Sequence, residues 1–111
     1  MIVRIYTGDD GQSHFEEQDM ESGPYPWGEL REATGVIFNR SQPGSFSDWH
    51  NAPRRQLVIT LSGAMEIGIA DGTLRQFGPG SVLFADDLTG QGHTTRTVGD
   101  EPRLSVSVPI P

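Results

Sequence analysis

The chain has 111 residues, which suits one domain of ordinary size and leaves no room for a separate cofactor domain. It contains no Cys and no Lys, so disulfides, thiolate metal sites, Cys nucleophiles and lysine Schiff-base chemistry are excluded. Fifteen acidic residues against eight Arg give a net charge of −7, which argues against nucleic acid as a partner because its phosphates would be repelled.

The N-terminal run over residues 2–7 is rich in β-formers and is predicted to be a strand. Arg4 interrupts its apolar residues, so the run is too short for the core of a signal peptide. No window approaches the ~18 apolar residues that a membrane-spanning helix requires. We therefore expect a cytoplasmic protein with no membrane partner.

Residues 8–32 are acidic and rich in turn-forming residues. We expect an irregular arm here, and only residues 28–33 could hold a helical turn. Residues 1–33 would then form a strand and an acidic arm that packs on a barrel formed by residues 34–111, as one domain overall. A disordered tail over 8–32 is the alternative.

From residue 34 onward the pattern is that of short strands separated by Gly and Pro turns, with one strand about every 8–12 residues. No segment has a sustained helical apolar period. The spacing predicts an all-β sandwich or barrel. The expected strands cover residues 34–40, 46–50, 56–62, 64–70, 73–77, 81–85, 92–98 and 104–108.

Two of the three histidines occupy positions that suit a shared site. Asp48 and His50 lie two residues apart in a predicted strand, so their side chains should leave the same face. Gln56 begins the next strand, and His93 follows a glycine-rich loop. Imidazole nitrogens with carboxylate or amide oxygens are typical ligands of divalent transition metals.

These residues resemble the first motif of the cupin superfamily, G-x5-H-x-H-x3–4-E-x6-G. His50 matches the second His of that motif, Asp48 replaces the first, and Gln56 replaces the Glu. The interval from Gln56 to Gly63 fits, whereas the interval before it is one residue longer than in the family.

The second cupin motif, G-x5-P-x-G-x2-H-x3-N, has a partial match further along the chain. Gly80 opens it, Asp86 stands at the Pro position, His93 arrives two residues late, and Thr97 stands in place of Asn. The resemblance covers about residues 35–108. It implies a cupin-type double-stranded β-helix, that is, a jelly-roll barrel.

The resemblance also implies one divalent ion, Fe, Mn, Ni or Zn, held in the barrel by Asp48, His50, Gln56 and His93. If these residues converge, the imidazole rings of the two His should lie within about 5 Å of each other, because both would bond one ion at roughly 2.0–2.1 Å. A metal-free cupin, whose polar residues bond to one another or to water, is the equal alternative.

Neighbouring positions suggest where a substrate would bind. If Gln56 faces the lumen, alternation turns Arg54, Val58 and Thr60 to the same side. An inward Arg54 could bind a substrate carboxylate through its planar guanidinium; the alternative is that it lies on the surface or pairs with the acidic arm. Asp86 and Asp87 are expected to be solvated loop acids.

Two functions fit these features. The first is a metal-dependent cupin enzyme, an oxygenase, isomerase, cyclase or lyase that acts on a small organic acid or phenolic metabolite. The second is a metal-free cupin that binds a small-molecule ligand as a sensor or accessory module. The sequence distinguishes the two only through Gln56, where a Glu would have favoured the enzyme.

A homodimer is also expected. With Gln56 facing inward, the aliphatic residues Leu57, Ile59 and Leu61 point out of the barrel. Leaving such a row in water forgoes roughly 1.5–3 kcal/mol per side chain, and large exposed apolar patches normally mark contacts. Cover by the N-terminal arm within one chain is the alternative.

Overall fold

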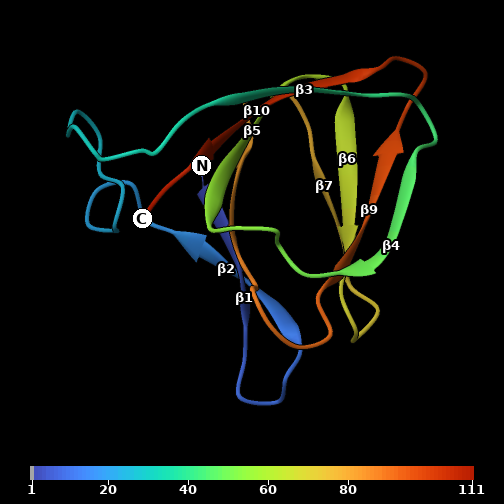
Figure 1. Cartoon of the computed structure of the whole chain (residues 1–111), viewed down its shortest axis with the longest axis horizontal. Coiled ribbons are helices and arrows are strands. Elements are labelled where there is room, and N and C mark those ends of the chain that lie inside the picture. The colour runs from blue at the N-terminus through green and yellow to red at the C-terminus, as the bar shows by residue number, and fades with distance from the viewer. Residues whose placement is uncertain (1) are drawn as a thin grey trace.

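The protein folds into two β-sheets that face each other, and the computed structural model describes residues 2–111. The six-stranded sheet has the order β2-β1-β8-β5-β10-β3, and the four-stranded sheet has the order β4-β9-β6-β7 (Figure 1). The all-β prediction is confirmed. The strands are β1 (Ile2–Thr7), β2 (Ser13–Gln18), β3 (Ile37–Ser41), β4 (Phe46–His50), β5 (Gln56–Ser62), β6 (Ala64–Gly68), β7 (Leu74–Phe77), β8 (Val82–Asp86), β9 (His93–Val98) and β10 (Arg103–Pro109).

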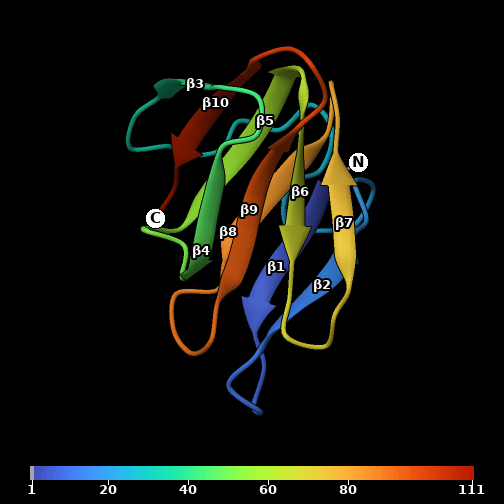
Figure 2. The same cartoon turned by 90° about the vertical axis from the view of Figure 1, so that its right-hand side faces the viewer.

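Figure 2 looks onto the four-stranded sheet, with β4, β9, β6 and β7 running from left to right. The neighbouring strands within this sheet are antiparallel. In the larger sheet β1 pairs in parallel with β8, while the other pairs are antiparallel. No helix among residues 2–111 is long and apolar enough to cross a membrane.

The acidic N-terminal segment is more regular than expected. Residues 13–18 form the edge strand β2, paired along its whole length with β1, where an irregular arm had been predicted. Phe15 packs against the apolar core and lies 6.3 Å from the ring of Phe77 on β7, measured between ring centroids. Pairing with β1 and the inward Phe15 therefore override the low β-propensity of the acidic residues.

The following segment, residues 19–36, extends away from the two sheets (Figure 1). Residues 28–33, the one stretch that could have held a helical turn, contain no helix. The ring of Tyr25 meets Phe84 of β8 edge-on at 5.4 Å between centroids. Beyond it, Trp27 and Leu30 are 65% and 100% exposed. The segment returns to the larger sheet at Thr34, whose backbone nitrogen donates to the carbonyl of Pro109 on β10 at 2.8 Å.

The apolar core fills only part of the space between the sheets. It is formed by residues of β1, β6, β7 and β8 and of the β6–β7 turn, namely Val3, Ile5, Met65, Ile67, Ile69, Phe77 and Leu83. These strands lie toward the β2 and β7 edges of the two sheets. The space toward the β3 and β4 edges is lined differently and contains the candidate site.

Candidate functional site

A pair of histidines lies where β4 and β9 meet. His50 and His93 are direct partners in the antiparallel ladder, and their ring centroids are 4.5 Å apart with the planes inclined by 59°. The expectation that the two rings lie within about 5 Å is confirmed. Directly opposed positions on neighbouring antiparallel strands carry side chains on the same face, so the register itself brings the two imidazoles together.

Hydrogen bonds hold both rings in one orientation. Nδ1 of His50 donates to the backbone carbonyl of Asp48 at 2.7 Å, and Nδ1 of His93 donates to Oδ2 of Asp87 at 2.5 Å. A carbonyl oxygen or a carboxylate can only accept, so each Nδ1 carries the proton. Each Nε2 is therefore the nitrogen with a free lone pair, and both rings line the same cavity.

Asp87 orients His93 from inside the protein. Its side chain is completely buried, and Oδ2 also accepts from the hydroxyl of Ser13 at 2.7 Å. The other oxygen, Oδ1, has no hydrogen-bond partner among residues 2–111. The interpretation of Asp87 as a solvated loop acid was wrong, because Ser13 of β2 and His93 of β9 cover it.

Asp86 is not solvated either. Its side chain is only 9% exposed and accepts hydrogen bonds from Arg4 and Arg55, at 2.8 and 3.0 Å for the closest contacts. One feature of the sequence could have indicated this burial: both carboxylates directly follow the apolar run of β8.

The structure does not bring Asp48 to the histidines. The β4–β9 ladder is regular up to Ser47 and shifts before His50, which marks a β-bulge. The extra residue breaks the two-residue alternation, so Asp48 is exposed and its Oδ1 accepts from the backbone nitrogen of Trp49. Only the backbone carbonyl of Asp48 contributes to the site.

Gln56 is 7% exposed and lines the cavity, as the cupin resemblance implied. Its Oε1 accepts from Nη1 of Arg54 at 3.2 Å. Arg54 itself is not among the residues that line the cavity. Of the other expected substrate-binding residues, Val58 lines the cavity, whereas Thr60 is buried behind it and accepts a hydrogen bond from Arg103.

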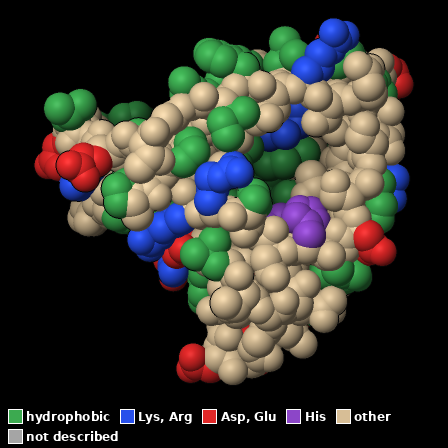
Figure 3. Space-filling view, viewed as in Figure 1, with side chains coloured by type: hydrophobic (Ala, Val, Ile, Leu, Met, Phe, Trp, Pro, Cys, Tyr) green, Lys and Arg blue, Asp and Glu red, His purple; other side chains and the backbone are tan. Residues whose placement is uncertain are grey.

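A cavity of about 270 Å³, which we call the lumenal cavity, opens beside the His pair. Figure 3 looks into its hollow, which His50 borders on one side. One wall is apolar and comes from β5, β6 and β8. Apart from Ala52 and Pro53 of the β4–β5 loop, the remaining lining is polar or cationic, and no Asp or Glu of residues 2–111 takes part in it. The lining consists of Asn39, Arg40, Ser41, His50, Ala52, Pro53, Gln56, Val58, Met65, Ile67, Leu83, Ala85, His93, Thr95, Arg103, Ser105 and Ser107.

The polar lining arises because β10 turns its polar face inward. Arg103, Ser105 and Ser107 are 6%, 2% and 5% exposed, whereas Leu104 on the opposite face is 40% exposed. Ser107 accepts a hydrogen bond from Asn39 of β3 at 3.0 Å. Alternation alone places these serines together on one face of the strand, but it does not say which face is buried.

Arg103 is a site residue that the sequence did not reveal. Its Nε and Nη2 donate to the hydroxyl of Thr60 at 3.3 and 3.0 Å. Within residues 2–111 no carboxylate forms an ion pair with it. Burial lowers the pKa of the guanidinium from its ordinary value to about 10, so it remains charged at neutral pH.

These side chains are a poor set of ligands for a tightly held divalent ion. Two imidazole nitrogens face the cavity, but Asp48 lies outside it, and the Gln56 oxygen is hydrogen-bonded to the cationic Arg54. No group of three His, Asp or Glu suited to a metal occurs in the described part of the chain. Sites for such ions normally combine three or four protein donors.

Solved structures of other proteins share this arrangement of strands. The chain superposes on a protein with a double-stranded β-helix domain from Klebsiella pneumoniae with a TM-score of 0.55 and 25% identity, over 77% of this chain and 79% of that one. A cupin 2 conserved barrel domain protein from Salinispora arenicola matches with a TM-score of 0.57 and 22% identity, over 78% and 70% of the two chains. The chain is a cupin-fold protein. The fold implied by the partial motifs is thereby confirmed.

Other cupin-fold structures differ widely in what they are described to be. A sugar phosphate isomerase of the cupin superfamily from Silicibacter pomeroyi matches with a TM-score of 0.56 and 20% identity, over 92% of this chain and 60% of that one. The polyketide cyclase RemF from Streptomyces resistomycificus matches with a TM-score of 0.51 and 20% identity, over 98% and 75%. No protein-family model and no curated protein matches the sequence.

Proposed function

We propose that this cupin-fold protein binds a small organic molecule in the lumenal cavity without requiring a resident metal ion. The observation that carries the proposal is the polar interior of β5 and β10. Buried Gln, Thr, Arg and Ser side chains lower stability relative to an apolar core unless they have partners. Retaining them around an open cavity is typical of a binding site, where stability is lost in favour of function.

The size and lining of the cavity support a metabolite-sized ligand. Its volume of about 270 Å³ lies just below the ~300–1,000 Å³ of pockets that hold drug-sized molecules. Such pockets typically combine apolar walls with a few polar groups that fix the orientation of the ligand. Here the apolar wall includes Met65, Ile67 and Leu83, and the His pair supplies polar groups at the opening.

A second candidate function, proton-transfer catalysis, rests on Asp87 and His93. A buried carboxylate that accepts from Nδ1 of a histidine leaves Nε2 free to take a proton from a ligand, as a general base does. Isomerases and cyclases often proceed by such proton transfers. Two of the structurally similar proteins are a sugar phosphate isomerase and a polyketide cyclase. Under this proposal His93 is the base and Asp87 is the positioning residue.

The binding proposal is tested by screening a small-fragment library against the 15N-labelled protein by NMR. Binding in the lumen should shift the signals of Val58, His93 and Ser105 together. A screen whose hits move only surface residues would refute the proposal. Incubating each lumenal hit with wild type and with His93→Gln in D2O then tests catalysis, because only wild type should exchange a ligand C–H proton.

Metal dependence is tested separately. We expect elemental analysis of protein purified without a chelating column to find less than one divalent ion per chain. Titration calorimetry should show weak Zn²⁺ or Mn²⁺ binding to wild type, tighter binding to Gln56→Glu, and none to His93→Ala. Stoichiometric metal in the purified protein would contradict the metal-free proposal and favour the metal-dependent enzyme.

A further inference from the structure

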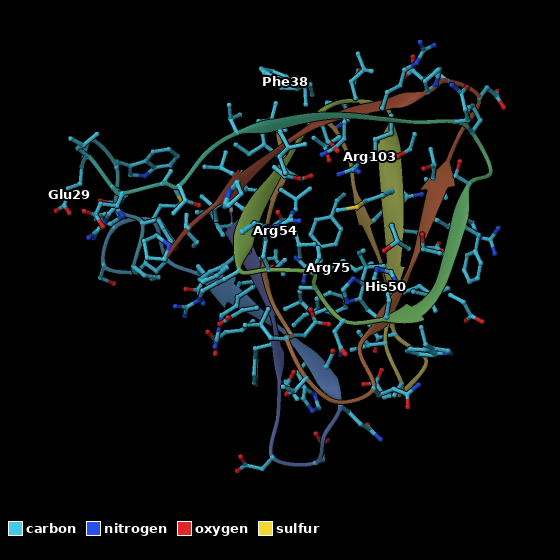
Figure 4. All side chains as sticks on the ribbon, in the orientation of Figure 1. Glu29, Phe38, His50, Arg54, Arg75 and Arg103 are labelled. Atoms are coloured by element: carbon cyan, nitrogen blue, oxygen red, sulfur yellow. The ribbon has the colours of Figure 1, made fainter. Side chains whose placement is uncertain are left out.

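We propose that Arg103 is the anion-binding group of the lumenal cavity and that the ligand of this protein is a small carboxylic acid with an apolar body. The inference rests on the proposed lumenal binding function and names its ligand class. Arg103 is the first residue of β10 and pairs with Ser41 of β3. It lies on the side of the cavity away from His50, as the labelled side chains in Figure 4 show.

The charge of Arg103 has no counter-charge among residues 2–111. Arg103 is only 6% exposed, and its hydrogen-bond acceptor is the neutral hydroxyl of Thr60. A chain of net charge −7 offers many carboxylates, yet none in the described residues lines the cavity. Buried charges are normally paired, so the missing partner is expected to be an anion that enters from solvent.

The geometry of the guanidinium leaves the right donors free. Thr60 occupies the side formed by Nε and Nη2, so Nη1 and the second hydrogen of Nη2 have no acceptor among residues 2–111. These two nitrogens form the end of the planar fork that binds a carboxylate through two parallel hydrogen bonds. Ser105 and Asn39 line the cavity and can donate to the same anion.

The opposite wall selects the body of the ligand. Val58, Met65, Ile67 and Leu83 present apolar side chains to the same space. Inorganic phosphate would satisfy Arg103 but would leave this wall in contact with water. A carboxylate attached to an aromatic or aliphatic body satisfies both. The His pair at the opening would then meet the far end of the ligand.

The test uses four probes on the full chain: 4-hydroxybenzoate, benzoate, the neutral 4-hydroxybenzamide and inorganic phosphate. Affinities are measured by NMR titration, with the Arg side-chain Nε–H signals as reporters. We expect both acids to bind and to shift the Arg103 signal, with the amide at least tenfold weaker. Acids and amide binding equally would overturn the anion site while leaving a lumenal binding site in place.

Variants separate Arg103 from the general charge of the protein. Arg103→Met should remove the preference for acid over amide, and Arg103→Lys should keep a reduced preference because it retains the charge but not the fork. Arg96→Met, which removes the same charge from the exposed face of β9, is the matched control and should bind the acids like wild type. An unchanged preference in Arg103→Met would overturn the inference.

Two further outcomes would also count against the inference. Phosphate binding at Arg103 without binding of either acid would overturn the carboxylate assignment. If no probe binds and the fragment screen also finds no lumenal hit, both the inference and the proposed function fail. Titration of the Arg103 signal in the unmodified protein keeps the test valid even if a variant does not fold.

Discussion

Replacing Arg103 and Thr60 together with Met and Val should stabilise the protein in the absence of ligand. Because the guanidinium is buried, its pKa is lowered from the ordinary value to about 10, and this shift corresponds to about 3 kcal/mol of unfavourable charge burial. Its hydrogen bonds to the Thr60 hydroxyl offset about 1 kcal/mol of this. We therefore expect the free energy of unfolding to rise by about 2 kcal/mol.

Thr60 must change together with Arg103, because its buried hydroxyl would otherwise lose its partner at a cost of about 1–3 kcal/mol. Arg103→Met alone is therefore expected to be less stable than the double variant by about 1–3 kcal/mol. The gain should be measured by urea unfolding followed by circular dichroism at pH 7, and a rise in Tm of roughly 4–8 °C per kcal/mol should accompany it.

The pH dependence provides an internal control. The folded protein holds the Arg103 proton less tightly than the unfolded chain does. The penalty is therefore complete below pH 10 and is relieved as the pH rises from about 10 toward the higher pKa that the guanidinium has in the unfolded chain. The difference between wild type and the double variant should therefore shrink at pH 11. A double variant less stable than wild type by more than about 1 kcal/mol at pH 7 would refute an unpaired charge.

Three further predictions follow from individual contacts. Asp87→Ala should lower the free energy of unfolding by roughly 2–4 kcal/mol, because His93 and Ser13 lose a buried acceptor. A His93 Nδ1–H signal that persists in the 15N NMR spectrum of this variant would contradict the role of Asp87 in holding that proton. Gly63→Ala should lower the free energy of unfolding by at least about 2 kcal/mol more than Gly72→Ala, as measured by urea unfolding. Both glycines have positive φ, but only at Gly63 would a Cβ lie 2.8 Å from the Cα of Arg103. Equal losses of stability in the two variants would exclude the steric argument. We expect light scattering at micromolar concentration to give twice the mass of one chain for wild type. Leu61→Asp should give the mass of a single chain, because Leu61 is 54% exposed on β5 and a charge there would oppose an apolar contact. A monomeric wild type would exclude the homodimer.

The strand pattern was largely predictable from local sequence. Strands β4 and β5 begin and end where expected, because Gly and Pro turns bound them and alternation marks their faces. The proximity of the two His was also predictable, since the partial cupin motifs place them on strands that such a barrel pairs. Acidic β2 was missed because pairing with β1, not its own composition, makes it a strand.

The site itself was only half predictable. Gln56 lies in the cavity, as the cupin resemblance implied, and alternation then places Val58 there too. The bulge before His50, by contrast, turned Asp48 outward. A bulge is a feature of the ladder between two strands, and nothing in the sequence of β4 alone indicates it.

Burial of charge was decided by the tertiary structure alone. Asp87 acquires its partner Ser13 from 74 residues away, and Arg103 acquires Thr60 from 43 residues away. Composition and alternation describe a strand and its neighbours in the chain, so they indicate which residues share a face. Which face is buried, and whether a buried charge meets a counter-charge, depends on the strands packed against it, and those contacts form only when distant segments of the chain come together.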